Sequence, residues 1–165
     1  MEKALGVCKK NVKGAILERG LERFTKLSLF FPVIKDEILN YNWLLTDIDA
    51  DYYSDSLKNN HYELISGEKF MQLIEGDQFT FVWGVFSAIP KQISIEKIIE
   101  EQIPYANGYE GFWNNPVSIQ NSVAVIEMVL WDGTAALIIS KSEHVINKFI
   151  DYYKFSKLLE DYNEN

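Results

Sequence analysis

Two apolar runs joined by Asp132-Gly133 form the clearest pattern in the chain, between Ser122 and Ser140. Asp and Gly both tolerate the positive φ of a two-residue type I′ turn, so the segment predicts a β-hairpin in which Trp131 faces Thr134. Because side chains alternate between the two faces of a strand, this register sorts the cross-strand pairs by face. One face holds Val129 with Ala136 and Glu127 with Ile138, and the other, fully apolar face holds Leu130 with Ala135, Met128 with Leu137 and Ile126 with Ile139. The apolar face is expected to lie on the core.

Glu127 interrupts this pattern, because a carboxylate in an apolar strand must reach solvent, a partner or a cation. We expect it on a partly solvated face. The alternative is an acid placed in a cleft.

The rest of the chain mixes helical and strand periods. Helical spacing predicts a helix over Asn11–Leu29, with Ile16, Leu17, Leu21, Phe24 and Leu27 on its apolar stripe, and a second helix from Pro32 through Leu39. Strands are expected at Lys3–Cys8, Asn42–Ile48, Tyr62–Ile65 and Gln78–Ala88; in the last of these, Phe79, Phe81, Trp83 and Val85 share a face. Three further helices are expected to begin after the capping residues Ser66, Ser94 and Ser142.

Mixed strands and helices, with a hairpin and no Gly-rich strand-to-helix crossover, favour an α+β fold. We expect a single domain over residues 1–165, with a mostly antiparallel or mixed sheet of about five strands and helices packed largely on one face. The long loop from Pro104 to Pro116 is rich in Gly, Asn and aromatic residues, which is typical of loops that carry function when ordered.

Charge narrows the range of partners. The formal net charge is −8, and it is unevenly distributed: residues 1–40 carry +3 and the remaining 125 residues carry −11. An acidic body argues against nucleic-acid binding, which needs basic surface, and is compatible with a basic protein partner or with simple solubility. No apolar run approaches the length of a membrane span, and the single cysteine, Cys8, cannot form an internal disulfide, so the cytoplasm is the expected compartment.

The alternating carboxylates Asp47, Asp49 and Asp51 follow a strand-like segment, as they would in a Mg²⁺ or phosphoryl-transfer site. The short motif resembles the first motif of haloacid-dehalogenase-type phosphatases, which would make Asp47 the nucleophile and Asp49 the general acid. An EF-hand loop starting at Asp47 fails, because Tyr52 stands at its sixth position and Lys58 at its twelfth. A small metal-dependent hydrolase using Asp47, Asp49 and Glu127 is therefore an alternative function.

Acid-flanked tyrosines suggest protein recognition instead. Tyr52 and Tyr53 lie between Asp51 and Asp55, and aromatic side chains in polar loops are enriched at protein interfaces. This stretch of about five residues resembles the recognition stretch of immunity proteins that neutralise nuclease bacteriocins. In overall style the short, acidic, aromatic-rich chain also resembles uncharacterised single-domain proteins of bacteria or their phages. The resemblance to immunity proteins implies a surface that docks on a strongly basic toxin domain.

We therefore expect a non-enzymatic protein-binding module, an immunity or inhibitor protein that neutralises a basic toxin or effector by occluding its active surface. The expected partner-binding residues are Asp47, Asp49, Asp51, Tyr52, Tyr53, Asp55, Tyr109 and Trp113. Because GxSxG, P-loop and GxGxxG motifs are absent and neither His61 nor His144 has metal-ligand spacing, we expect no catalytic residue, metal or cofactor. A third possibility is a small-ligand-binding or counter-defence module with a pocket lined by Trp83, Trp113 and Tyr109.

Overall fold

A computed structural model describes residues 11–51 and 62–165 of the chain. The expected strand Lys3–Cys8, His61 and the segment containing Tyr52, Tyr53 and Asp55 lie outside these residues. The strands are β1 (Lys13–Leu17), β2 (Tyr41–Ala50), β3 (Tyr62–Ile65), β4 (Phe81–Pro90), β5 (Ile126–Trp131), β6 (Ala135–Ser140) and β7 (Lys157–Leu158). The α-helices are α1 (Phe31–Ile34), α3 (Gly67–Gly76), α4 (Ile95–Glu100), α5 (Glu143–Tyr152) and α6 (Leu159–Glu164), and short 3₁₀ turns lie at 27–29, 38–40 and 111–113.

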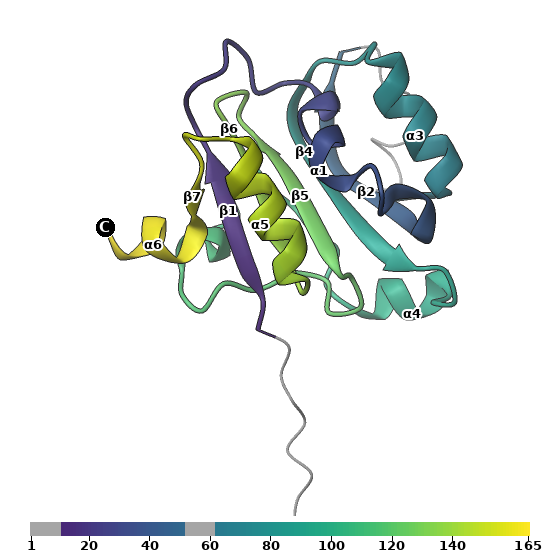
Figure 1. Cartoon of the computed structure of the whole chain (residues 1–165). Helices are drawn as coiled ribbons and strands as arrows, with labels where there is room; N and C mark the ends of the chain where they lie inside the picture. Colours follow the sequence, from purple (N-terminus) through teal and green to yellow (C-terminus); the bar gives the residue numbers. More distant parts are fainter. Residues whose placement is uncertain (1–10, 52–61) are drawn as a thin grey trace, which may run out of the picture.

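The strands form one sheet in the order β3-β2-β4-β5-β6-β1-β7, with every pair antiparallel. Helices α1, α3 and α5 lie across one face of this sheet, here called the helix side (Figure 1). The buried residues of these helices form the main core together with inward-facing residues of the central strands, including Trp43, Phe86, Met128 and Ile138. The α+β class and the antiparallel sheet are confirmed, but the described sheet has seven strands, not about five.

The opposite face, here called the loop side, is also buried. Residues 101–125, here called the covering loop, connect α4 to β5, and Ala106, Phe112 and Val117 from this loop pack on Val85, Val129 and Leu137 of the sheet. The short helices α4 and α6 contribute Ile98 and Leu159 to this side. The central strands are therefore covered on both faces, which explains their nearly continuous apolar sequences.

The hairpin forms, but its register differs from the predicted one. Asp132 and Gly133 both have positive φ, 50° and 65°, and the N–H of Thr134 donates to the carbonyl of Trp131 at 2.9 Å, as in the expected turn. Thr134 is left out of the ladder, however, and Trp131 pairs with Ala135. All later pairs shift by one position, so Glu127 pairs with Ile139 and Met128 with Ile138. Ile126, Met128 and Leu130 do lie on the main core, as expected, but Ala136 and Ile138 accompany them there. The predicted β6 partners Ala135, Leu137 and Ile139 lie on the opposite side of the sheet instead.

The predicted helix over Asn11–Leu29 is wrong. Lys13–Leu17 is a strand between β6 and β7, and Gly20, with φ of 93°, lies in the irregular segment that follows. Ile16 and Leu17 are both buried because the sheet is covered on its two faces. Adjacent apolar residues therefore lacked the alternation expected of a strand and fitted the spacing of a helix instead. The second predicted helix is reduced to α1 and a 3₁₀ turn.

Several other local predictions hold. However, α5 begins after Ser142 without a side-chain cap from that residue, and the strand predicted at 78–88 is β4, which begins only at Phe81. Strands form at the predicted 42–48 and 62–65, and the hydroxyls of Ser66 and Ser94 cap α3 and α4. In β4, a bulge against Asp49 and Ala50 leaves Val82 without a strand partner, so Phe81 lies on the helix side while Trp83 and Val85 lie on the loop side. The predicted common face of Phe81, Trp83 and Val85 is therefore wrong. Within the described ranges 11–51 and 62–165, the helices are too short or too polar to span a membrane.

Candidate functional site

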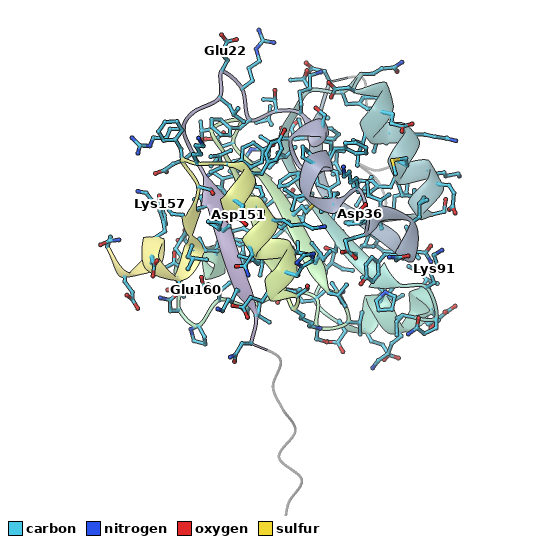
Figure 2. The ribbon with its side chains drawn as sticks, in the orientation of Figure 1. Glu22, Asp36, Lys91, Asp151, Lys157 and Glu160 are labelled. Carbon is cyan, nitrogen blue, oxygen red and sulfur yellow. The ribbon has the colours of Figure 1, made fainter. Side chains whose placement is uncertain are left out.

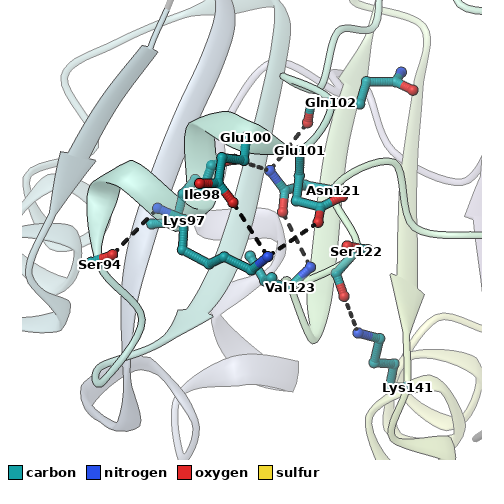
Figure 3. Close-up of polar contacts among 10 residues, drawn as sticks. All are labelled: Ser94, Lys97, Ile98, Glu100, Glu101, Gln102, Asn121, Ser122, Val123 and Lys141. Carbon is teal, nitrogen blue, oxygen red and sulfur yellow. Dashed lines mark hydrogen bonds and ion pairs between the residues drawn. The ribbon is translucent and has the colours of Figure 1, made fainter.

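The covering loop is held at both ends by a buried amide. The side-chain nitrogen of Asn121 donates to the carbonyls of Ile98 and Gln102 at 3.2 and 3.1 Å, and its oxygen accepts from the N–H of Val123 at 3.2 Å (Figure 3). Asn121 thus ties the end of α4 to the segment that leads into β5. The bond to Ile98 adds to the one that this carbonyl already accepts from the N–H of Glu101, and together these contacts fix where the loop leaves α4 and where it enters β5.

Asp47 holds the middle of the loop. It has a φ of 50° at a break in the β2–β4 register, which turns its side chain out of the regular alternation. Its Oδ2 accepts hydrogen bonds from the backbone N–H groups of Ala106 and Asn107 at 2.8 and 2.9 Å. The two regions predicted to bind a partner are therefore in direct contact, and Asp47 anchors the loop that carries Tyr109 and Trp113.

Glu127 lies beneath the same loop. Its side chain is fully buried, so the expectation of a partly solvated face is wrong; the covering loop supplies the cover that strand periodicity could not reveal. Oε2 accepts from the N–H of Gln120 at 3.0 Å, and Oε1 has no hydrogen-bond partner among the described residues. Burial raises the pKa of Glu127 from 4.5 to about 7, although the hydrogen bonds from Gln120 oppose this shift.

Two hydroxyls accompany this carboxyl on the loop side. Ser87 is directly opposite Glu127 across the β4–β5 pair, and Thr46 lies one strand further away on β2. Both side chains are completely buried, and neither hydroxyl oxygen has a hydrogen-bond partner within the described part of the chain. The face of the sheet beneath the covering loop therefore contains three buried polar side chains, those of Thr46, Ser87 and Glu127.

Gln120 links one of these side chains, that of Glu127, to Tyr105 of the covering loop. Its side-chain oxygen accepts from the N–H of Tyr105 at 3.1 Å, and its side-chain nitrogen donates to the carbonyl of Tyr105 at 2.8 Å. Since the N–H of Gln120 also donates to Glu127, Gln120 connects the backbone of Tyr105 to the buried carboxyl of Glu127.

Aromatic rings form a continuous row over the outer surface of this region. The rings of Tyr105 and Tyr109 lie 5.1 Å apart between centroids, Tyr109 and Phe112 4.6 Å, and Phe112 and Trp131 5.9 Å. Trp131 then contacts Trp83 at 4.8 Å and Trp113 at 5.1 Å, and Trp113 contacts Tyr162 at 5.9 Å. These residues, here called the aromatic row, meet mostly edge to face, the arrangement that aromatic quadrupoles favour.

Much of the aromatic row is accessible. Phe112 is buried, Tyr105 is exposed, and the other members of the row are half-buried. Half-buried tryptophan and tyrosine offer rigid apolar area to a partner at low entropic cost, because the surrounding rings already fix their rotamers.

Carboxylates lie near this row. Asp49 is the register partner of Trp83, Asp132 follows Trp131 at the hairpin turn, and Glu110 lies within the covering loop between Tyr109 and Phe112. All three are exposed, and within the described ranges none forms an ion pair. Moreover, the chain contains no Lys or Arg in residues 36–57, 70–90 or 98–140, which include β2, β4, β5, β6 and the covering loop. The acidic and basic side chains of these strands and of the covering loop are therefore all acidic.

The structure describes five of the eight predicted partner-binding residues. Asp47 is an anchor, Asp49 is exposed beside Trp83, and Asp51 is exposed at the end of β2, where its N–H donates to the carbonyl of Thr80. Tyr109 and Trp113 belong to the aromatic row. The sequence interpretation missed Trp131 and Tyr162 as members of this surface; the position of Trp131 beside a hairpin turn was the available signal.

The carboxylates do not converge in the way a metal site requires. Among residues 11–51 and 62–165, no three His, Cys, Asp or Glu side chains group closely enough to hold a metal ion. Asp47 Oδ2, the proposed nucleophile of the hydrolase alternative, already accepts two backbone hydrogen bonds, and Glu127 is buried beneath the loop.

Comparison with known proteins adds no assignment. No protein family model matches the chain, and no curated protein or solved structure matches it either. The functional argument therefore rests on this chain's own residues.

Proposed function

We propose that this chain is a non-enzymatic protein-binding module, an immunity or inhibitor protein that neutralises a basic toxin or effector by occluding its active surface. The observation that carries the proposal is the largely half-buried aromatic row, with nearby carboxylates that form no ion pair among residues 11–51 and 62–165. It lies over β4, β5 and the covering loop, none of which contains a Lys or Arg.

The chemistry of this surface fits a partner rich in Lys and Arg. A cation can lie over the face of a tryptophan or tyrosine ring, and the neighbouring carboxylates Asp49, Glu110 and Asp132 can pair with further cations. Like charge gathered on one face also steers a basic partner into the correct encounter, which raises the association rate.

Occlusion follows from the same contacts. A toxin or effector that acts on nucleic acid holds phosphates with Lys and Arg side chains. If those side chains pair with the carboxylates of this chain, the substrate's phosphates have no place to bind. Inhibition of this kind requires no catalytic group on the inhibitor.

The architecture favours tight binding because the surface is already ordered. Asp47, Gln120 and Asn121 fix the covering loop through six hydrogen bonds to its backbone or to residues at its ends. A partner therefore does not have to order this loop when it binds, and less interaction energy is lost to conformational entropy.

The test is affinity capture from the native host with matched variants, read by mass spectrometry. The first variant is Asp49→Lys/Glu110→Lys; its control, Glu68→Lys/Glu75→Lys, makes the same change of charge on exposed positions of α3, across the sheet. Wild type and control should enrich the same basic protein, and the first variant should lose it. Equal capture by all three proteins would contradict the proposal.

The aromatic contribution is tested separately. Trp113→Ala should weaken binding of the captured partner by at least about tenfold, as expected for a central aromatic anchor. Tyr52→Ala and Tyr53→Ala test the predicted contribution of the adjoining acidic segment. Inhibition itself is tested by adding the wild-type chain to the purified partner and measuring loss of the partner's activity.

A further inference from the structure

The helix side carries a second surface with the opposite character. Two adjoining hollows of about 220 and 440 Å³ lie between the segment that follows β1 and the end of α5. Leu21, Tyr152 and Tyr153 line both hollows, so they form one continuous depression, here called the basic groove.

The groove exposes large apolar side chains. Leu21 is 41% exposed, Phe155 53% and Tyr152 59%, and all three line it. Single exposed apolar residues are ordinary on a protein surface, but three that share one depression form a patch.

Its charged lining is mostly positive. Arg19, Arg23, Lys26 and Lys154 contribute four cations, whereas Glu22 is the one carboxylate among the described lining residues. The Arg19 guanidinium lies 4.9 Å from the centroid of the Phe155 ring, and the Lys26 ammonium donates to the carbonyl of Asp77 at 3.1 Å. Neither contact neutralises its cation, because a ring and a carbonyl carry no net charge.

The floor of the groove is firmly held. The hydroxyl of Tyr153 donates to the carbonyl of Leu29, which ties the end of α5 to the segment before α1. Gly20, with φ of 93°, lets the chain turn directly against the Phe155 ring, where a Cβ would overlap that ring. The depression is therefore built into the fold.

We propose that the basic groove binds an acidic segment of a partner protein, with an apolar or aromatic side chain of that segment seated against Leu21, Tyr152 and Phe155. Charge complementarity selects this occupant: Asp or Glu residues on either side of the anchor would pair with Arg19, Arg23 and Lys154. The groove and the aromatic row lie on opposite sides of the sheet, so the chain can hold an acidic segment and a basic partner at once. Figure 2 shows that Glu22, which lines the groove, lies far from the exposed Lys91, a position that serves below as a control outside the groove.

The experiment begins with a random peptide library displayed on phage and selected on the full chain. Selected peptides that carry Asp or Glu around an aromatic residue or Leu are then synthesised with a fluorophore. Their affinity is measured by fluorescence anisotropy against wild type and three variants. Arg23→Glu/Lys154→Glu reverses the charge of the groove, and Tyr152→Ala removes part of its apolar wall. Lys69→Glu/Lys91→Glu is the control, with the same change of charge at exposed positions outside the groove.

The charge-reversed variant should lose at least about tenfold in affinity, Tyr152→Ala should bind several-fold more weakly, and the control should match wild type. Binding should also weaken as salt rises. Selection of only basic or neutral peptides, or equal binding of acidic peptides to the charge-reversed variant, overturns the proposal. So does a wild-type dimer in sedimentation that the charge-reversed variant lacks, because the groove would then be filled by a second copy.

Trp113→Ala separates this inference from the proposed function. It should leave acidic-peptide affinity unchanged, whether or not the aromatic row binds a basic protein.

Discussion

The carboxylate of Asp47 accepts a hydrogen bond from the backbone nitrogen of Ala106, 59 positions later in the chain, at a distance of 2.8 Å. The next backbone nitrogen, that of Asn107, donates to the same oxygen. One side chain of the acidic segment thus positions the loop that carries the aromatic row. The two predicted recognition regions are therefore one structural unit.

Asp47→Ala should loosen this unit. The substitution leaves two backbone N–H groups without their acceptor, so we expect the free energy of unfolding to fall by about 1–3 kcal/mol. Amide hydrogen exchange at Ala106 and Asn107 should accelerate. Asp49→Ala is the matched control, since Asp49 is exposed and should change stability little. Unchanged exchange at both amides in Asp47→Ala would contradict the anchoring role.

Glu127 should make stability depend on pH. Its folded-state pKa of about 7 lies above its unfolded value near 4.5, so the folded state binds more protons between these values. Stability from this group is therefore fully present below about pH 4.5 and is lost as pH rises through about 7. The loss approaches roughly 3 kcal/mol at higher pH, an order-of-magnitude figure from 1.36 kcal/mol per pKa unit.

Glu127→Gln isolates this effect. The amide keeps an oxygen for the N–H of Gln120 and does not ionise. Urea unfolding at pH 5 and pH 8 should show a smaller fall in stability for the variant than for wild type. Parallel pH profiles for the two proteins would show that Glu127 does not titrate as inferred.

The two ends of α3 offer a test of close packing with one chemical change. At Gly67 an added Cβ would overlap the carbonyl oxygen of Ile38, whereas at Gly76 it would meet no atom within 4 Å. Gly67→Ala should therefore destabilise the fold by at least about 1–3 kcal/mol, because the backbone must move. Gly76→Ala should be neutral or stabilising by up to about 1 kcal/mol. Thermal unfolding of the pair checks the prediction, and a similar change in both would refute it.

Calorimetric titration with Mg²⁺ or Mn²⁺ separates the binding module from the hydrolase alternative. We expect no saturable heat, because Asp47 Oδ2 is engaged by the covering loop and Glu127 is buried. Saturable binding that Asp49→Asn abolishes would favour a metal-dependent function.

The sequence correctly predicted features that are determined by a few neighbouring residues. The turn at Asp132-Gly133 and the capping serines Ser66 and Ser94 could be identified from neighbouring residues alone. β1 could not, because Ile16 and Leu17 are both buried by layers that come from later in the chain. The hairpin register was wrong because the omission of Thr134 from the ladder has no clear signature in the residue pattern.

The candidate site shows the same difference between residue types, which the sequence reveals, and long-range contacts, which it does not. Asp47, Tyr109 and Trp113 could be selected by residue type, but the contact between Asp47 and the loop spans 59 positions and leaves no periodic trace. Glu127 stood out as an acid in an apolar strand, yet its burial depends on a loop whose path the sequence did not indicate.

The two outermost strands of the sheet that residues 11–51 and 62–165 form, β3 and β7, are short. β3 has four residues and β7 has two, and each carries a charged side chain, Glu63 and Lys157. Such brief, charged margins are poor templates for adding a foreign strand through main-chain pairing, which also protects against aggregation. The proposed recognition therefore relies on side chains of the two broad faces, where residue identity, rather than backbone geometry, would determine which partner is accepted.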